Sequence, residues 1–339
     1  MKKSLSIASL IVFFFFARFG FAMEYYPNFG PLKTRTQNPL YLLFLSPTPE
    51  SSATLEKGHF RFSVETTLSN LIERDFPKNG VNVDMDMEVY RTALNFAYGF
   101  HPNFEAGIQL PFLSLNGGFM DGIIQGYHNL FGFPNEGRNK VPNNRYSYKI
   151  TRGGKTLYSV SSQAFGFSDL NVYLKYQMMK EEGRRPGLSL RVSLKFPTGE
   201  RDNGLGSGAP DFDFNLALEK SFKRLHSYTN LSYLVLGGFD PLDDYVQPLA
   251  LTFSQAFEVN ITHIASVVAQ IKGGTPLFHD TGTPKLDRMP LDLDIGFKGT
   301  GPRKGPWRHF EWEFAVSEDL IPSGPSVDFG LRFNLGAKF

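Results

Sequence analysis

The chain has 339 residues, a formal net charge of +2 and no cysteine, but as many as 34 phenylalanines. The near-neutral charge gives no electrostatic argument for a nucleic-acid or strongly acidic partner. The lack of cysteine excludes disulfides, thiol catalysis, cysteine-ligated metals and a lipid anchor on an N-terminal cysteine. A mean hydropathy of −0.22 excludes a bundle of membrane-spanning helices, whereas a β-barrel in lipid needs apolar residues at only every second position.

The first segment, residues 1–22, is typical of a secretory signal peptide. Lys2 and Lys3 form a basic start, an apolar stretch follows, and residues 20–22 offer a small-x-small cleavage site. A retained membrane anchor is the alternative, but Arg18 cuts the apolar run short of the ~20 residues that a span needs. We therefore expect export through a cleaved signal peptide.

Residues 23–56 carry five prolines and one apolar run, and they precede the first predicted strand. Because proline removes a backbone donor and interrupts regular structure, we do not expect a strand throughout this segment. It either folds into the lumen as a plug or lies as a periplasmic extension, and we favour the plug. The residues assigned to the plug are those of the apolar run: Tyr41, Leu42, Leu43, Phe44 and Leu45.

From residue 57 to the end, apolar and polar residues alternate with a period of two, which is typical of β-strands with two different faces. In one example, Leu190 and Val192 alternate with Arg191 and Ser193. Twelve segments show the pattern with varying clarity: 59–69, 88–100, 103–113, 168–179, 187–197, 210–222, 227–237, 248–260, 263–273, 290–299, 307–317 and 327–339.

The connections between these segments alternate in length. Short turns are predicted near 101–103, 180–186, 223–226, 261–262 and 300–306, and longer loops elsewhere, including after the first strand. With both termini in the periplasm, short turns lie there and long loops are extracellular. The predicted fold is therefore all-β, an antiparallel transmembrane β-barrel of about 12 strands, with a soluble sandwich or propeller as the alternative.

The longest predicted loop, residues 114–166, contains a candidate helix. Phe119, Ile123, Tyr127 and Phe131 (or Leu130) recur at roughly helical spacing. This helix would lie on the outer leaflet or fold over the pore mouth as a lid, or it would only pack the loop against the rim. Basic residues follow and offer a surface for anionic lipopolysaccharide: Arg138, Lys140, Arg145, Lys149, Arg152 and Lys155.

The polar faces of the predicted strands carry both signs of charge. In a narrow lumen such charges should pair, because an unpaired buried charge costs several kcal/mol. We expect them to brace the barrel or to line a polar pathway, and about 12 strands leave too little room for an open general porin. The predicted lumen charge network comprises Arg61, Glu65, Glu105, Asp169, Lys175, Arg191, Lys195, Asp211, Asp213, Glu219, Asp292, Asp294, Lys298, Glu311, Glu313, Asp328 and Arg332.

Catalytic and metal-binding patterns are weak. His309 is predicted to share a strand face with Glu311 and Glu313, which suggests an acid–base group or a metal site, but a lumen charge network explains the same residues. A His-Glu-x-x-His zinc pattern does not occur. We expect no enzyme activity, no cofactor and no bound metal.

The final segment alternates up to Phe339, the last residue. This ending resembles the C-terminal signature of bacterial outer-membrane barrels, whose last strand is read by the barrel-assembly machinery. Phe339 is therefore assigned as an assembly signal, and the assembly machinery as a partner. The resemblance also implies an outer-membrane location in a Gram-negative cell envelope.

Six short segments of the chain carry a family resemblance: Phe29-Gly30-Pro31-Leu32, Gln37-Asn38-Pro39-Leu40, residues 117–132, Lys195-Phe196-Pro197-Thr198-Gly199, Gly206-Ser207-Gly208 and Ser317-Glu318-Asp319. Through them the chain resembles an uncharacterised, domain-of-unknown-function family of Gram-negative outer-membrane barrels. More loosely, the stretch from Lys195 to Gly208 resembles barrels linked to uptake of phenolic and hydrophobic compounds. The family resemblance implies a barrel but no established substrate.

Two functions of different class follow from these patterns. The first is a narrow channel or transporter for small apolar or amphipathic molecules, gated by residues 24–56. The second is a non-transporting structural or adhesive barrel that acts through the 114–166 loop. The solute, the oligomeric state and the openness of the lumen are not set by the sequence.

Overall fold

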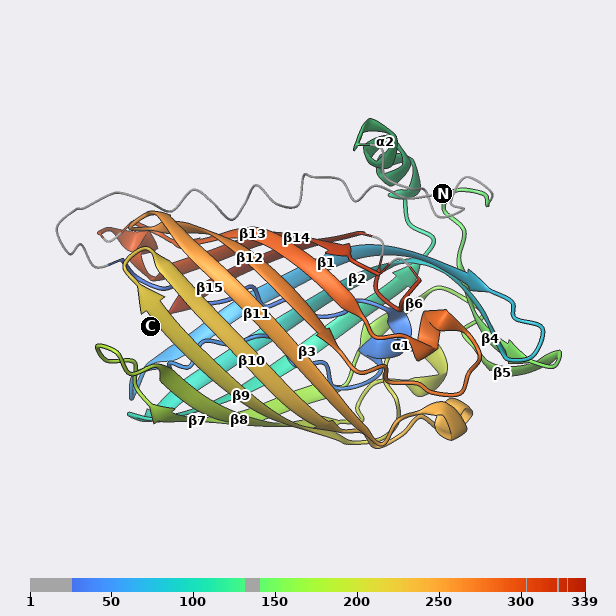
Figure 1. The fold of residues 1–339 in the computed structure, drawn as a ribbon, viewed down its shortest axis with the longest axis horizontal. Helices are drawn as coiled ribbons and strands as arrows, with labels where there is room; N and C mark the ends of the chain where they lie inside the picture. Colours follow the sequence, from blue (N-terminus) through green and yellow to red (C-terminus); the bar gives the residue numbers. More distant parts are fainter. Residues whose placement is uncertain (1–25, 132–140, 303, 322, 328) are drawn as a thin grey trace, which may run out of the picture.

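The computed structural model describes residues 26–131, 141–302, 304–321, 323–327 and 329–339. The predicted signal peptide, together with Arg138, Lys140 and Asp328, lies outside these ranges. In the described part of the chain, twelve antiparallel strands form the wall of a barrel (Figure 1). They are β1 (Phe60–Asp75), β2 (Val81–His101), β3 (Phe104–Asn116), β7 (Leu170–Met179), β8 (Gly187–Phe196), β9 (Asp211–Phe222), β10 (Leu225–Val235), β11 (Leu249–Thr262), β12 (Ala265–Gly274), β13 (Leu291–Thr300), β14 (Phe310–Asp319) and β15 (Phe329–Lys338).

The sheet closes where its last strand meets its first. β15 pairs with β1 in a register that runs from Arg61 opposite Lys338 to Asn70 opposite Phe329. Just beyond it, Phe60 and Phe339 exchange two backbone hydrogen bonds of 2.9 Å. Closure leaves the wall without a free edge, as a bilayer demands of any β-structure. The predicted barrel of about 12 strands is thus confirmed.

The wall is polar inside and apolar outside. On β9, Asp211 and Asp213 are fully buried, whereas Phe212 and Phe214 on the opposite face are each 43% exposed. A water-soluble protein would place these residues the other way round. The arrangement follows directly from the two-residue alternation of the sequence, and it fits a wall with hydrocarbon on its outer side.

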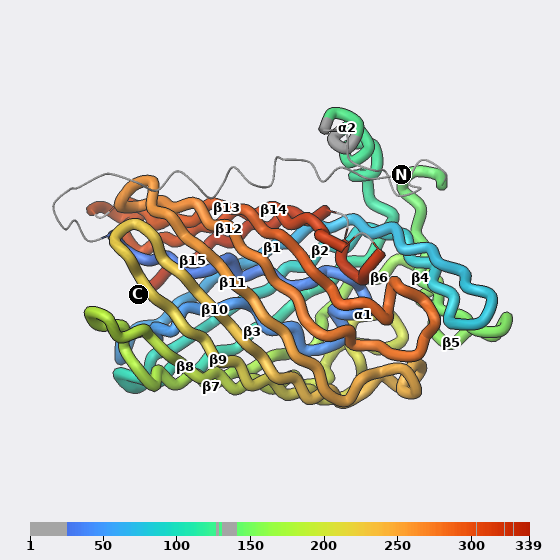
Figure 2. The backbone as a smooth tube through the Cα atoms, in the orientation of Figure 1, coloured from blue at the N-terminus to red at the C-terminus, as the bar shows by residue number. Residues whose placement is uncertain are grey.

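Short turns and long connections separate to opposite ends of the barrel (Figure 2). The turns after β2, β7, β9, β11 and β13 lie at the end that also holds the C-terminus, and the long connections lie at the other end. We call these the periplasmic and the extracellular end, following the arrangement of bacterial barrels.

One predicted loop is a pair of strands instead. The sequence prediction of a long loop after the first strand was wrong, since β1 and β2 continue to Asp75 and from Val81 and leave only residues 76–80 as a turn. Val83, Met85 and Met87 are buried on the inner face of this extension. These side chains belong to one buried apolar cluster with residues 40–45, and this packing favours a strand over a loop.

The connection after β3 is also partly regular. β4 (Ser147–Arg152) pairs with the extension of β2 and with β5 (Lys155–Ser159), while β6 (Ala164–Phe167) pairs with the upper part of β3. α2 (Asp121–Phe131) lies earlier in the same connection, and α3 (Pro284–Asp287) lies between β12 and β13. Among the residues described, no helix has the length and apolar character needed to cross a membrane.

Candidate functional site

The lumen is occupied by the part of the chain that precedes β1. We call residues 26–56 the lumenal segment. It starts at the periplasmic end, where the backbone N–H of Phe29 donates to Glu258 of β11 at 3.0 Å. It reaches the extracellular end at α1 (Pro39–Leu42) and returns to β1, as the blue trace in Figure 1 shows.

Inward-facing carboxylates accept hydrogen bonds from the backbone of this segment. Asp211 accepts from the N–H of Leu45 at 2.7 Å, and Glu105 accepts from the N–H of Leu55 at 2.8 Å. Further bonds of this type lead from Gly30 to Glu258, from Lys33 to Glu313 and from Ser52 to Glu219. A buried backbone outside regular structure must find partners for its polar groups, and the wall supplies them.

Inward-facing cations bind the carbonyl groups of the same segment. Lys195 donates to the carbonyl of Leu43 at 2.6 Å, and Lys298 donates to the carbonyl of Pro31 at 2.6 Å. Lys175 reaches the carbonyl of Ala53 at 2.8 Å. The charged side chains of the wall therefore bind a second piece of the same chain as well as one another.

A cluster of buried charges lies deep in the lumen. Glu65 of β1 forms ion pairs of 2.8 Å with both Arg91 of β2 and Arg332 of β15, and it lies 3.6 Å from Arg35 of the lumenal segment. Arg332 continues to Glu313 at 2.7 Å. The cluster joins β1, β2, β14 and β15, so it braces the wall across the point of closure.

The other predicted charges form separate groups. Lys195 lies 2.9 Å from both Asp169 and Asp211, and Lys272 lies 3.0 Å from Asp292 and 2.9 Å from Asp294.

The remaining predicted charges form single pairs or bind the lumenal segment. Arg61 pairs with Glu311 at 3.0 Å near the periplasmic mouth. Lys298 pairs with Glu313 at 3.0 Å, and Arg191 lies 3.7 Å from Asp213. Lys175 lies 3.8 Å from Glu50, and Glu219 accepts from Ser51 and Ser52 of the lumenal segment.

Sequence reasoning missed Arg35 and Glu50, two of the charges that the lumenal segment brings to these groups. Glu50 lies 2.9 Å from Arg191 and 3.6 Å from Lys33. Burial raises the pKa of Glu50, but the cations Lys33, Lys175 and Arg191 outweigh it and lower the pKa to about 2. An irregular segment has no periodicity that could identify an inward-facing side chain, so the sequence offers no signal for either residue.

The extracellular end of the lumen is filled by apolar side chains around α1. Leu40 and Leu43 are fully buried there, and the rings of Tyr41 and Phe44 lie 6.2 and 6.0 Å from the ring of Phe278. All five residues assigned from the sequence to a plug are buried in this core. The surrounding side chains come from the extracellular connections and from the extension of β2.

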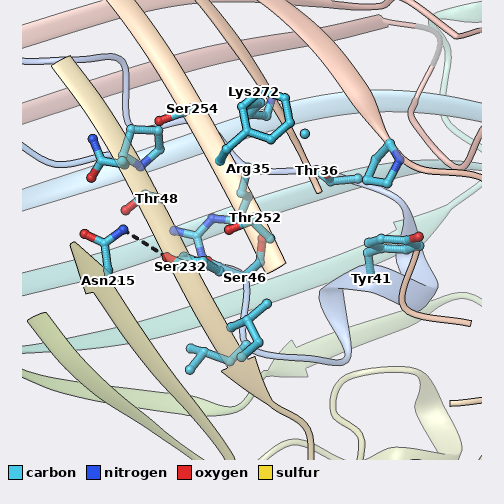
Figure 3. Close-up of a pocket in the computed structure, with 18 of the residues that line it drawn as sticks. Arg35, Thr36, Tyr41, Ser46, Thr48, Asn215, Ser232, Thr252, Ser254 and Lys272 are labelled. Atoms are coloured by element: carbon cyan, nitrogen blue, oxygen red, sulfur yellow. Dashed lines mark hydrogen bonds between the residues drawn. The ribbon is translucent and has the colours of Figure 1, made fainter. Parts of the chain in front are cut away.

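Three cavities follow one another along the lumenal segment. A periplasmic cavity of about 400 Å³ shares Lys33, Glu50 and Arg61 with a cavity of about 80 Å³. That second cavity shares Arg35 and residues 45–48 with a third, of about 60 Å³, which extends to Tyr41 below the apolar core (Figure 3). The lumenal segment thus separates the cavities from one another.

The candidate lid helix differs from its prediction in one respect. Phe119 was expected on the helix, but it precedes α2, whose first residue is Asp121. Ile123 lies on the helix and is 62% exposed. The side chains of Tyr127 and Phe131 lie outside the described part of the structure.

The basic residues that follow have different surroundings. Arg145 pairs with Asp84 of β2 at 2.7 Å, and Arg152 donates to the hydroxyl of Tyr245. Lys149 and Lys155 are exposed. Two of the four described cations are therefore already engaged by neighbouring side chains.

The predicted grouping of His309 with two glutamates was wrong. His309 belongs to the 3-10 turn Pro306–His309 that precedes β14, and its ring stacks on Phe339 at 5.6 Å. A turn breaks the two-residue alternation, so His309 does not share the inner face with Glu313. Within the described ranges, no three His, Cys, Asp or Glu side chains converge in a way that could hold a metal ion.

A different histidine has a serine and an amide as neighbours. His226 of β10 lies 2.9 Å from the hydroxyl of Ser221 and 2.7 Å from Asn260, and it is almost fully buried. The hydroxyl of Ser221 donates to Glu181 at 2.9 Å, so its proton is directed away from the imidazole. We therefore interpret this group as a brace at the periplasmic end.

A family model described as protein of unknown function (DUF3187) matches residues 6–339. No curated protein matches the chain. The COG4313 outer membrane channel from Pseudomonas putida F1 has a similar structure, with a TM-score of 0.57 and 14% identity over 86% of this chain and 99% of that chain. The Pseudomonas putida toluene transporter TodX has a TM-score of 0.38 and 8% identity, over 91% of this chain and 98% of that chain. A Pseudomonas aeruginosa FadL homologue has a TM-score of 0.39 and 12% identity, over 85% of this chain and 91% of that chain.

Proposed function

Starting from the fact that the chain belongs to the DUF3187 family of proteins of unknown function, we propose that it is a narrow outer-membrane channel, exported by a signal peptide, for small apolar or amphipathic molecules. In this conformation the lumenal segment acts as its plug. The observation that carries the proposal is the series of three cavities through the lumen. The lumenal segment, which is not part of the wall, lies between them.

The outer surface supports the membrane location. Along β2, the outward residues Phe96, Tyr98 and Phe100 are 46%, 43% and 44% exposed, respectively. Each Å² of apolar surface exposed to water costs ~25 cal/mol. Such a wall is therefore stable in hydrocarbon and would aggregate in water. The fold of the Pseudomonas putida channel supports the same interpretation, because that chain is covered almost completely.

The lining of the route favours amphipathic over purely apolar solutes. The third cavity is bordered by the polar side chains of Asn215, Ser232 and Ser254, and by the apolar residues Leu45 and Leu277 (Figure 3). A solute with a polar group and a small apolar body can satisfy both kinds of neighbour. At about 60 and 80 Å³, the two inner cavities are too small for a large molecule unless the segment shifts.

Single-channel conductance in planar bilayers tests the proposal. The full mature chain is compared with a variant that lacks residues 24–56 and with Leu43→Asp, which places a charge in the apolar core around α1. A difference in gel mobility between unheated and heated samples confirms folding in each case. We expect low conductance for the full chain and clearly higher conductance for both variants.

Lys149→Asp is the control, since Lys149 is exposed on β4, which is not one of the twelve wall strands. It should conduct like the full chain. If the folded deletion variant conducts no better than the full chain, the plug is disproved, and a non-transporting barrel explains the chain better.

A further inference from the structure

The helix α2 is attached to the outside of the barrel wall. On β2, the even-numbered residues face outward, as the exposure of Phe96 and Tyr98 shows. Glu88 belongs to the same face, and its carboxylate accepts from the backbone N–H groups of Phe119, at 2.6 Å, and Met120. The residues just before α2 therefore bind the outer face of β2. Nearer the periplasmic end, the same face carries the lipid-facing side chains.

A second polar contact fixes the start of the helix to the same surface. Asp121 accepts from the side chain of Asn70 at 3.0 Å, and Asn70 lies opposite Glu88 in the pairing of β1 with β2. Met120 and Ile124 are almost fully buried beneath the helix. Figure 1 shows the result, in which α2 projects from the side of the barrel and does not cover its mouth.

The attachment point coincides with a change in the outer surface of β2. From Phe100 to Tyr90, every second residue is apolar, aromatic or threonine, and the next three outward residues are Glu88, Asp86 and Asp84. The lower stretch spans residues 90–100, close to the ~9–11 residues of a tilted strand that crosses the hydrocarbon. The upper boundary of the hydrocarbon therefore lies near Tyr90, just below α2.

The free face of α2 is apolar at this boundary. Phe119, Ile123 and Leu130 are 61%, 62% and 78% exposed. At 100° per residue, Ile123 and Leu130 point in nearly the same direction, and Phe119 continues that line before the helix starts.

From these observations we infer that α2 is an interfacial helix that inserts Phe119, Ile123 and Leu130 into the acyl-chain boundary of the outer leaflet. A helix that projects sideways at the level where an apolar wall turns polar lies in the plane of the interface. Its exposed face then buries apolar area in lipid. The inference does not depend on the proposed channel function.

Fluorescence quenching by brominated lipid tests the inference. Trp307 and Trp312, the two native tryptophans, are replaced by phenylalanine, and one new tryptophan is placed at Ile123, Leu130, Gln125 or Asn129. Each folded protein is reconstituted into phosphatidylcholine vesicles with and without phosphatidylcholine brominated near the top of the acyl chains. A difference in gel mobility between unheated and heated samples confirms the barrel in each variant.

We expect brominated lipid to reduce the emission of Ile123→Trp and Leu130→Trp at least twofold, with a blue-shifted maximum. The controls Gln125→Trp and Asn129→Trp should change little. Equal quenching at all four positions, or none at any of them, would overturn the inference. Adding lipopolysaccharide to the vesicles should preserve the difference between the two pairs. Loss of quenching at Ile123 and Leu130 on that addition would also count against it.

Discussion

Lys195 of β8 donates a hydrogen bond from Nζ to the carbonyl oxygen of Leu43, at 2.6 Å, and thereby joins the barrel wall to the lumenal segment next to α1. The same ammonium group lies 2.9 Å from Asp169 and from Asp211. Asp211 in turn accepts from the backbone N–H of Leu45. A wall cation and a wall carboxylate thus bind both sides of Phe44, so the conformation of the segment depends on the charge state of the wall.

Lys195→Met is expected to destabilise the folded barrel by about 3–5 kcal/mol, because it leaves two buried carboxylates without their cation. It should also loosen the segment near Leu43. The midpoint temperature at which the gel mobility of the folded barrel changes to that of the unfolded chain measures the first effect, and protease sensitivity of residues 26–56 measures the second. The exposed Lys149→Met is the control and should change neither. A midpoint for Lys195→Met equal to that of Lys149→Met would contradict the assigned role.

Acidification is expected to weaken the binding of the lumenal segment through Glu50. Its pKa is lowered from an ordinary 4.5 to about 2. The resulting stabilisation, about 3 kcal/mol, is therefore fully present above pH 4.5 and is lost as the pH falls toward 2. Glu50→Gln lacks this contribution at every pH. The difference in unfolding free energy between the native chain and Glu50→Gln should be large at pH 7 and should shrink between pH 4.5 and 2. A difference that stays constant over this range would contradict the pairing of Glu50 with its cations.

The cost of a charged residue on the lipid-facing side of the wall should be largest at the middle of the bilayer and should fall toward its two surfaces. Leu216→Arg, in the middle of β9, is expected to cost ~2–4 kcal/mol, and Phe222→Arg, at the periplasmic end of the same strand, only ~0–1 kcal/mol. Reversible urea unfolding in lipid vesicles measures both. Equal costs at the two positions would argue against a bilayer around this strand.

The attachment of α2 should depend on Gly118. A side chain there would overlap the carboxylate of Glu88, and the backbone φ of +65° disfavours any other residue. Gly118→Ala is therefore expected to release α2, which limited proteolysis within residues 117–146 detects. Gly122→Ala is the matched control, since a Cβ atom at Gly122 meets no neighbour. This control should stabilise the helix by ~0.5–1 kcal/mol. Equal proteolysis of the two variants would refute the role of Gly118.

Much of the wall could be predicted because a barrel strand repeats one rule. Phe212, Asp213 and Phe214 occupy the expected faces, and the short turns lie together at the end that holds the C-terminus. The same rule also identifies the extension of β2, where valine and methionine at 81–89 alternate with polar residues. The predicted second strand nevertheless began only at residue 88, although the alternation itself predicts a strand from residue 81.

The alternation of the sequence by itself determined the barrel and the inner and outer faces of its strands. Each strand residue faces either hydrocarbon or the polar lumen, so its own chemical character shows which side it is on. Only the tertiary structure decided what the inward charges bind. Lys195, Asp211 and Glu105 bind backbone groups of residues 43–55. Those partners lie in an irregular segment, far from the strands in the sequence, so no local pattern records the contacts. Three-dimensional closure of the barrel around that segment brings them together.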